Sequence, residues 1–142
     1  MICVDASVAA KWVLAEEHSA RALALFYDSA AAREPVVIPP LLPLEVTNII
    51  RQRVRRGTLT VDDAEHALEE FLTFPLTLTT SPSPHTEALR LANQHNLPAA
   101  YDAYYLALAE TAGAVLWTAD QRLLRAVGTI LPFVRWIGDY SA

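Results

Sequence analysis

The sequence contains little cysteine, little lysine and no long hydrophobic run. Cys3 is the only cysteine among the 142 residues, so no disulfide can form within the chain and no cysteine-rich zinc site exists. No segment approaches the ~20 consecutive apolar residues that span a bilayer. The first residues also lack the basic region and apolar stretch of a secretion signal. We therefore expect a cytoplasmic protein without membrane association.

Positive charge is scarce as well. The chain has 11 basic and 16 acidic residues, which gives a net charge of −5, and Lys11 is its only lysine. This balance excludes a protein whose whole surface is a basic field for nucleic acid. It leaves room for a local basic patch, because four arginines lie close together: Arg51, Arg53, Arg55 and Arg56.

Apolar residues are abundant, at 53% of the chain, and they follow two alternating patterns. Short β-branched and apolar runs predict strands at residues 1–5, 36–38, 76–79, 114–118 and 130–134. Helical periodicity predicts helices at residues 6–14, 18–32, 43–56, 60–74, 85–95, 99–112 and 119–127. This alternation is typical of an α/β sandwich around a mainly parallel sheet. The length, without a linker or repeat, predicts one domain over residues 1–142.

Four acidic residues differ from the others because their sequence surroundings are apolar. Asp5 and Asp120 lie at or just past the ends of predicted strands, Glu45 lies in the first turn of a helix, and Asp102 lies near the start of another. Ligands of open parallel sheets bind outside the carboxyl ends of the strands, so these acids converge if the first and fourth strands are neighbours. Each acid alone could be a helix cap or a first-turn dipole partner. Their joint occurrence favours a site.

Four carboxylates in one place need a compensating charge. An all-oxygen ligand set favours Mg²⁺ or Mn²⁺ over Zn²⁺. Such an ion can activate a water for attack on phosphorus and stabilise charge on the phosphate oxygens. We therefore predict metal-dependent hydrolysis of a phosphodiester, with catalytic and metal-binding roles for Asp5, Glu45, Asp102 and Asp120.

The segments around these acids resemble the PIN-domain family, and within it the VapC-type toxins of bacterial toxin–antitoxin pairs. The matching segments are residues 4–8 with Lys11 and Trp12, 43–46 with Asn48, 101–103 with 105–109, and 118–120 with Leu123. The resemblance covers nearly the whole chain and keeps the motifs in the family's order. It implies a three-layer α/β/α sandwich whose five-stranded parallel sheet has the order 3-2-1-4-5.

The resemblance also implies an endoribonuclease that depends on Mg²⁺ or Mn²⁺ and acts as a toxin. Such toxins usually form homodimers or higher assemblies and are inhibited by a small VapB-like antitoxin. Carried over to this chain, the four acids would be the metal site, and Ser7, Asn48 and Thr118 would orient carboxylates or water. Some family members carry a further acid shortly after the last one, whereas residues 121–125 contain none.

Other polar and aromatic residues have less specific interpretations. Lys11 and the four arginines of residues 51–56 would contact RNA phosphates or antitoxin acids, although those arginines also suit the end of a helix dipole. Trp12 is predicted to pack in the core or at a dimer contact. The tyrosines at positions 101, 104 and 105 are predicted to divide between the core and a subunit contact. The four histidines lack metal-ligand spacing and are predicted to be structural or at the surface.

Two alternative functions stay open. A receiver-like regulatory domain also has acids at strand ends, but it needs adjacent acids after the first strand, an acid after the third and a late lysine. Here Ala6 follows Asp5, residues 76–80 contain no acid, and no lysine follows Lys11. A catalytically silent PIN-like binding module would act through its partner alone, and an activity assay separates it from an enzyme.

Overall fold

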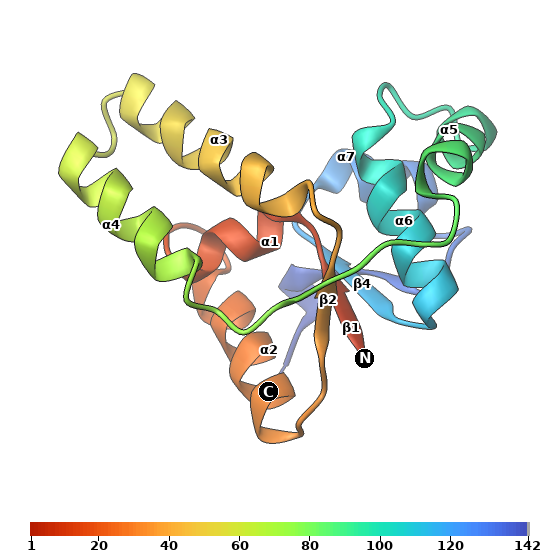
Figure 1. Ribbon diagram of the computed structural model, residues 1–142, viewed down its shortest axis with the longest axis horizontal. Helices are drawn as coiled ribbons and strands as arrows, with labels where there is room; N and C mark the ends of the chain where they lie inside the picture. Colours follow the sequence, from red (N-terminus) through yellow and green to blue (C-terminus); the bar gives the residue numbers. More distant parts are fainter. Residues whose placement is uncertain (142) are drawn as a thin grey trace.

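The computed structural model describes residues 1–141, and its centre is a five-stranded parallel sheet (Figure 1). The strands are β1 (Ile2–Val4), β2 (Val36–Ile38), β3 (Thr77–Leu78), β4 (Val115–Thr118) and β5 (Val134–Trp136). Their order is β3-β2-β1-β4-β5, and each neighbouring pair is parallel. This order confirms the fold that the resemblance implied.

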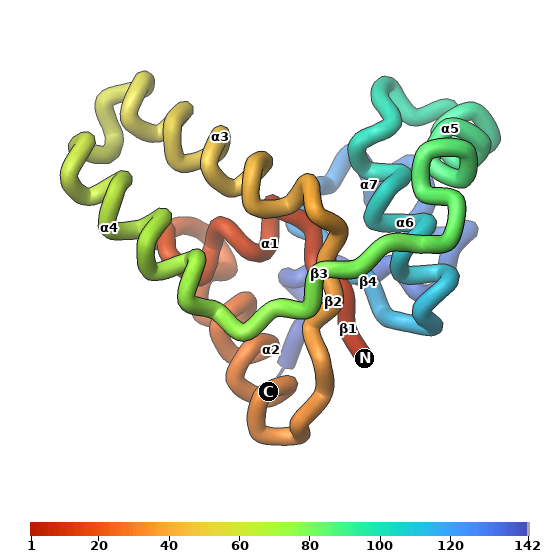
Figure 2. Tube along the Cα trace, viewed as in Figure 1, coloured from red at the N-terminus to blue at the C-terminus, as the bar shows by residue number. Residues whose placement is uncertain are grey.

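Seven α-helices connect and cover these strands. They are α1 (Ala6–Ala9), α2 (Ser19–Ala31), α3 (Leu42–Arg55), α4 (Val61–Phe71), α5 (Pro84–Gln94), α6 (Tyr101–Ala112) and α7 (Gln121–Val127). Two 3-10 turns, η1 (Ala10–Trp12) and η2 (Ile137–Asp139), complete the described residues 1–141. Helices α1 and α2 lie on one side of the sheet and α5 and α6 on the other, while α3 and α4 form a projecting hairpin (Figures 1 and 2). No helix within these residues is long and apolar enough to cross a membrane.

Local sequence signals explain several helix ends. Thr60 accepts a hydrogen bond from the Asp63 backbone N–H at the start of α4, and Gly113 ends α6 with a φ of 63°. That left-handed conformation favours glycine because it has no Cβ. The helix predicted for residues 6–14 is shorter than expected, because only α1 is α-helical and η1 continues it as a 3-10 turn.

The prediction for the last strand was wrong in its position. Residues 130–134 were expected to be extended, but β5 covers Val134–Trp136 and pairs with Leu116–Thr118 of β4. Pro132 has no backbone N–H to donate to a neighbouring strand, and Ile130 is 62% exposed rather than part of the core. The strand therefore begins only after the proline has been passed.

An aromatic cluster fixes α2 and η1 against the end of α4. Trp12 is 4% exposed, and its ring stacks on Phe74 with 5.1 Å between centroids and packs against Phe26 at 5.3 Å. Its indole Nε1 donates to the carbonyl oxygen of Ala22 at 3.0 Å, which satisfies the buried polar atom. Trp12 is therefore a core residue, which was one of the two positions predicted for it.

The central position of β1 places the end of this strand beside the end of β4. β1 lies between β2 and β4, so the chain leaves it toward one edge of the sheet and later returns on the other side. Val4 is in register with Trp117, and the Asp5 backbone N–H donates to the Trp117 carbonyl oxygen at 3.3 Å. The carboxyl ends of β1 and β4 thus meet at the point where open α/β sheets bind their ligands.

Candidate active site

Asp5 is held by three hydrogen bonds at the end of β1. Its Oδ1 accepts from the Ser7 hydroxyl at 2.5 Å and from the Val8 backbone N–H at 3.2 Å, and its Oδ2 accepts from the Thr118 hydroxyl. The bond to Val8 makes Asp5 the N-cap of α1. The interpretation of Asp5 as a helix cap is therefore confirmed, and this cap leaves its predicted role as a site acid open.

The Asp5 carboxyl group lies in an environment that disfavours its charge. It is only 4% exposed, and this desolvation raises its pKa to about 6, although the bonds from Ser7, Thr118 and Val8 act in the opposite direction. The charge of Asp102 raises the pKa further. A buried carboxylate of this kind is stabilised by a nearby cation.

Ser7 and Thr118 connect Asp5 to the segment that carries Asp120. The Ser7 hydroxyl oxygen accepts from the Ala119 backbone N–H at 2.8 Å, and that of Thr118 accepts from the Asp120 N–H at 2.9 Å. Each hydroxyl therefore donates to Asp5 and accepts from the β4–α7 turn. These contacts are the kind expected of residues that orient carboxylates.

Asp120 and Asp102 face each other across a small cavity. Asp120 caps α7 through Oδ1, which accepts from the Arg122 N–H at 2.8 Å and the Leu123 N–H at 3.4 Å. Asp102 lies in the first turn of α6, and both acids line a cavity of about 50 Å³. Desolvation and the charge of Asp120 raise the pKa of Asp102, whereas Arg122 lowers it.

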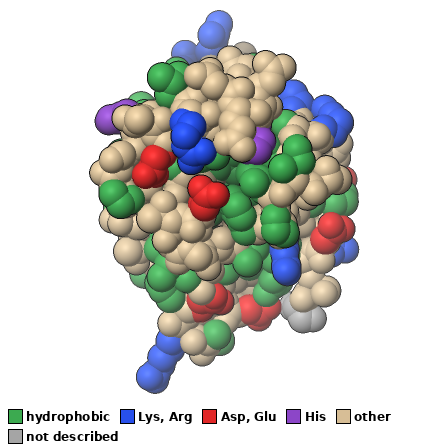
Figure 3. All heavy atoms as spheres, turned by 90° about the vertical axis from the view of Figure 1, so that its right-hand side faces the viewer, with side chains coloured by type: hydrophobic (Ala, Val, Ile, Leu, Met, Phe, Trp, Pro, Cys, Tyr) green, Lys and Arg blue, Asp and Glu red, His purple; other side chains and the backbone are tan. Residues whose placement is uncertain are grey.

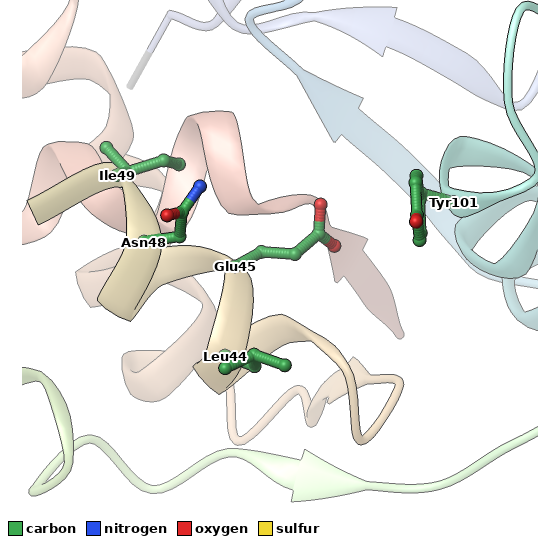
Figure 4. Close-up of a pocket in the computed structure, with 5 residues that line it drawn as sticks. All are labelled: Leu44, Glu45, Asn48, Ile49 and Tyr101. Atoms are coloured by element: carbon green, nitrogen blue, oxygen red, sulfur yellow. The ribbon is translucent and has the colours of Figure 1, made fainter. Parts of the chain in front are cut away.

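Glu45 reaches the same region from the first turn of α3. The Tyr105 hydroxyl donates to Glu45 Oε1 at 2.6 Å. The carboxylate extends from α3 toward Tyr101 of α6, across a hollow of about 510 Å³ that is also lined by Leu44, Asn48 and Ile49 (Figure 4). Burial raises the pKa of Glu45, the bond from Tyr105 lowers it, and the charge of Asp102 raises it.

Asp102 is the common electrostatic partner of the four acids. Its charge raises the pKa values of Asp5 and Glu45, and the charge of Asp120 raises its own pKa. The structure therefore brings all four predicted acids to one end of the sheet, from β1, α3, α6 and the β4–α7 turn.

The donor set fits a divalent cation in its chemistry. Four carboxylates, three of them with raised pKa values, are hard oxygen ligands whose mutual repulsion a cation would relieve. Over residues 1–141, no group of three or more His, Cys, Asp or Glu side chains is already arranged to hold a metal ion.

The remaining predicted residues have different surroundings. Asn48 is exposed beside Glu45, and its Oδ1 accepts from the Gln52 side chain at 3.5 Å. Lys11 Nζ and an Arg53 guanidinium nitrogen both bind the Glu16 carboxylate at 3.0 Å. These two cations are thus directed at Glu16, while the other three arginines are exposed: Arg51, Arg55 and Arg56.

Charge on the α5 side of the molecule is mixed. On the face shown in Figure 3, acidic and basic side chains are dispersed among hydrophobic and polar groups. This face carries no broad basic field, which agrees with the net charge of −5.

The sequence analysis missed the role of Tyr105 beside Glu45. Its side chain is 1% exposed, and burial together with the nearby acids raises its pKa, so the hydroxyl remains a hydrogen-bond donor. The available signal was a phenol on an otherwise apolar buried helix face, where its polar atom requires a partner. That the partner is Glu45, 60 residues away, depends on the tertiary fold.

Comparisons with known proteins identify the family of the chain. The PIN domain family model matches residues 2–128, a span that includes all four acids. Ribonuclease VapC3 of Pyrobaculum aerophilum is 33% identical over 124 residues, which are 86% of this chain and 91% of the relative. Ribonuclease VapC3 of Mycobacterium tuberculosis is 37% identical over 101 residues, which are 67% of each chain.

A solved structure shares the fold. The crystal structure of PAE2754 from Pyrobaculum aerophilum superposes with a TM-score of 0.67 at 29% sequence identity. The match covers 88% of this chain and 78% of the other. Together with the extent of the family match, these similarities show that the chain belongs to the PIN-domain family and, within it, to the VapC type.

Proposed function

We propose that this chain is an endoribonuclease that depends on Mg²⁺ or Mn²⁺ and acts as the toxin of a toxin–antitoxin pair. The observation that carries the proposal is the convergence of four carboxylates at one end of the sheet: Thr118 joins Asp5 to Asp120, Asp120 and Asp102 line one cavity, and Tyr105 of the same helix as Asp102 binds Glu45. The relatives' name, Ribonuclease VapC3, supports RNA as the substrate.

The metal ligands would be Asp5, Asp102, Asp120 and Glu45, of which Glu45 borders the open hollow. A cation held there would supply an activated water and stabilise charge on the phosphate oxygens. The chain's own contribution is orientation: Ser7 and Thr118 fix the Asp5 carboxylate, and Tyr105 fixes Glu45 through Oε1. Glu45 Oε2 remains at the edge of the hollow, where it would bind the cation or accept a proton from water.

The proposal extends to the partners and location of the protein. A VapB-like antitoxin, a homodimer or higher assembly, and a cytoplasmic location are typical of VapC-type toxins. We expect residues 1–142 to act as one domain. A receiver-like alternative gains no support, because Lys11, the only lysine, binds Glu16 rather than the acid cluster.

The experiment that tests this function is RNA cleavage by the purified full chain, with analysis of the product ends. We expect cleavage with Mg²⁺ or Mn²⁺, none with EDTA, and products without a 2′,3′-cyclic phosphate, because the nucleophile is water rather than the RNA 2′-hydroxyl. Cleavage that persists in EDTA would contradict the metal mechanism. Absence of cleavage of total cellular RNA in either metal would favour the silent binding module.

A further inference from the structure

A second hollow lies beside the one that contains Glu45. It has a volume of about 420 Å³ and is formed by the segments that follow β2 and β3 and by the first turns of α5 and α6. We call it the aromatic pocket and define it by Pro39, Pro40, Thr80, His85, Tyr101 and Tyr104. Its volume falls within the range of roughly 300–1,000 Å³ that is typical of small-molecule sites.

The aromatic pocket shares one lining residue with the hollow beside Glu45. Tyr101 lines both hollows, and Figure 4 shows its ring across from the Glu45 carboxylate. Asp102, the common partner of the acids, is the next residue in α6. The Tyr101 side chain is 66% exposed, so its ring is accessible from solvent. A ligand whose phosphate binds at the acids would therefore find an accessible aromatic ring next to Asp102 on α6.

The chemistry of the aromatic pocket differs from that of the acid site. Among the described residues that line it, none is an acid, a lysine or an arginine. Its walls are proline rings and tyrosine rings, which suit a flat uncharged ligand. A hydrogen bond between His85 Nδ1 and the Tyr104 hydroxyl orders the polar groups on one wall. That bond uses Nδ1, so Nε2 remains for the polar edge of a ligand.

We propose that the aromatic pocket binds one unpaired nucleobase of the RNA, next to the phosphate that is cleaved. This inference rests on the proposed ribonuclease function. An RNA strand has charged phosphates next to flat, uncharged bases. A phosphate would bind at the metal-loaded acids, and the neighbouring base would bind in the aromatic pocket. Stacking of single-stranded bases on aromatic side chains is a general mode of RNA recognition. Tyr101, which lines both hollows, is then the residue on which this base stacks.

The test measures binding separately from cleavage. The full-length Asp5→Asn chain is titrated, in Mg²⁺, into a fluorescein-labelled single-stranded RNA in which one position at a time is abasic. We expect removal of one particular base to weaken binding about tenfold, the size typical of one stacked base. In the Asp5→Asn, Tyr101→Ala chain, that same removal should have no effect. Equal penalties in the two chains would overturn the proposal.

Two further variants control the result. Tyr101→Phe keeps the ring and should keep the base penalty. Tyr27→Ala removes an equally exposed tyrosine, 62% accessible on α2, and should bind RNA like the parent chain. If Tyr101→Ala changes the association of protomers while the base penalty persists, the pocket is a protein contact and the proposal is wrong.

The failure of the pocket and the failure of the proposed function give different results. A base penalty that depends on Tyr101 would uphold the pocket even if the wild-type chain cleaved no RNA. A wild-type chain that cleaves RNA, combined with a penalty that Tyr101→Ala leaves unchanged, would reject the pocket alone.

Discussion

Tyr105 donates its phenolic hydroxyl to Oε1 of Glu45 at 2.6 Å and so joins α6 to α3 across 60 residues of sequence. The bond comes from a side chain that is 1% exposed, whereas Glu45 borders an open hollow. A buried donor therefore fixes one oxygen of a carboxylate that borders the open hollow.

Tyr105→Phe should strongly reduce the rate of RNA cleavage, whereas its effect on the unfolding free energy should be moderate. The substitution keeps the ring, so the loss of one hydrogen bond to a charged group should cost about 1.5–3 kcal/mol of unfolding free energy. Tyr140→Phe is the matched control, because the Tyr140 hydroxyl donates to Asp28 Oδ2, also at 2.6 Å, away from the four acids. Urea unfolding and cleavage rates check both variants. Equal cleavage rates in the two variants would contradict a positioning role for Tyr105.

Thr118→Val should remove one hydrogen bond from Asp5 and one from the backbone of Asp120. The Thr118 side chain is fully buried, and its hydroxyl donates to Asp5 and accepts from the Asp120 N–H. Valine has nearly the same shape but leaves the Asp120 N–H without its partner, which should cost about 1–3 kcal/mol. Thr118→Ser restores the hydroxyl and should recover cleavage. Full activity in Thr118→Val would show that this link is dispensable.

In the metal-free protein, Asp5 should make stability fall as pH rises from about 4 to 7. Its pKa is raised from 3.8 to about 6 in the folded chain, so the folded state binds the proton more tightly than the unfolded state does. At 1.36 kcal/mol per pKa unit, ionisation costs about 3 kcal/mol above the folded pKa. Asp5→Asn should therefore be more stable than the wild type at pH 7.5 in EDTA. A smaller difference should remain at pH 4, and denaturant curves at both values check this sign.

Mg²⁺ or Mn²⁺ should stabilise the folded protein at pH 7.5 and much less at pH 4.5. At 100 times its dissociation constant, a ligand of the folded state adds about 2.7 kcal/mol. At the lower pH, the Asp5 carboxyl, whose pKa is raised to about 6, is mostly protonated and therefore binds the cation less well. Thermal unfolding with and without the cation measures the effect. Asp102→Asn should abolish the shift, and Asp62→Asn, an exposed acid of α4, should preserve it.

The exposed arginines should contribute to RNA affinity more than Lys11 does. Arg55 and Arg56 are exposed at the end of α3, whereas Lys11 has a side chain that is 10% exposed and bound to Glu16. Arg55→Gln with Arg56→Gln should weaken RNA binding and reduce its salt dependence, because fewer phosphate counterions are displaced. Lys11→Gln should lower stability and leave the salt dependence unchanged. The reverse pattern in binding titrations at several salt concentrations would contradict this division.

The sequence predicted those features that follow from local patterns and from strand ends. Asp5 and Asp120 could be placed because each follows a short apolar strand, and the family resemblance supplied the strand order that brings them together. The partner of Tyr105 and the burial of Lys11 could not be predicted, because they depend on how α6 and η1 pack against α3. The later start of β5 could have been predicted from Pro132, because proline has no backbone N–H to donate to a neighbouring strand.

The most direct test of the central claim is the rate at which purified Asp102→Asn cleaves a defined RNA in Mn²⁺. Asp102 lines a cavity with Asp120 at the end of the sheet that also carries Asp5 and Glu45, so the loss of its charge should reduce the rate by at least a hundredfold while the chain stays folded by circular dichroism. Asp62→Asn, measured beside it, should cleave at the wild-type rate. If folded Asp102→Asn cleaves as fast as the Asp62→Asn control, the four acids are not the catalytic centre.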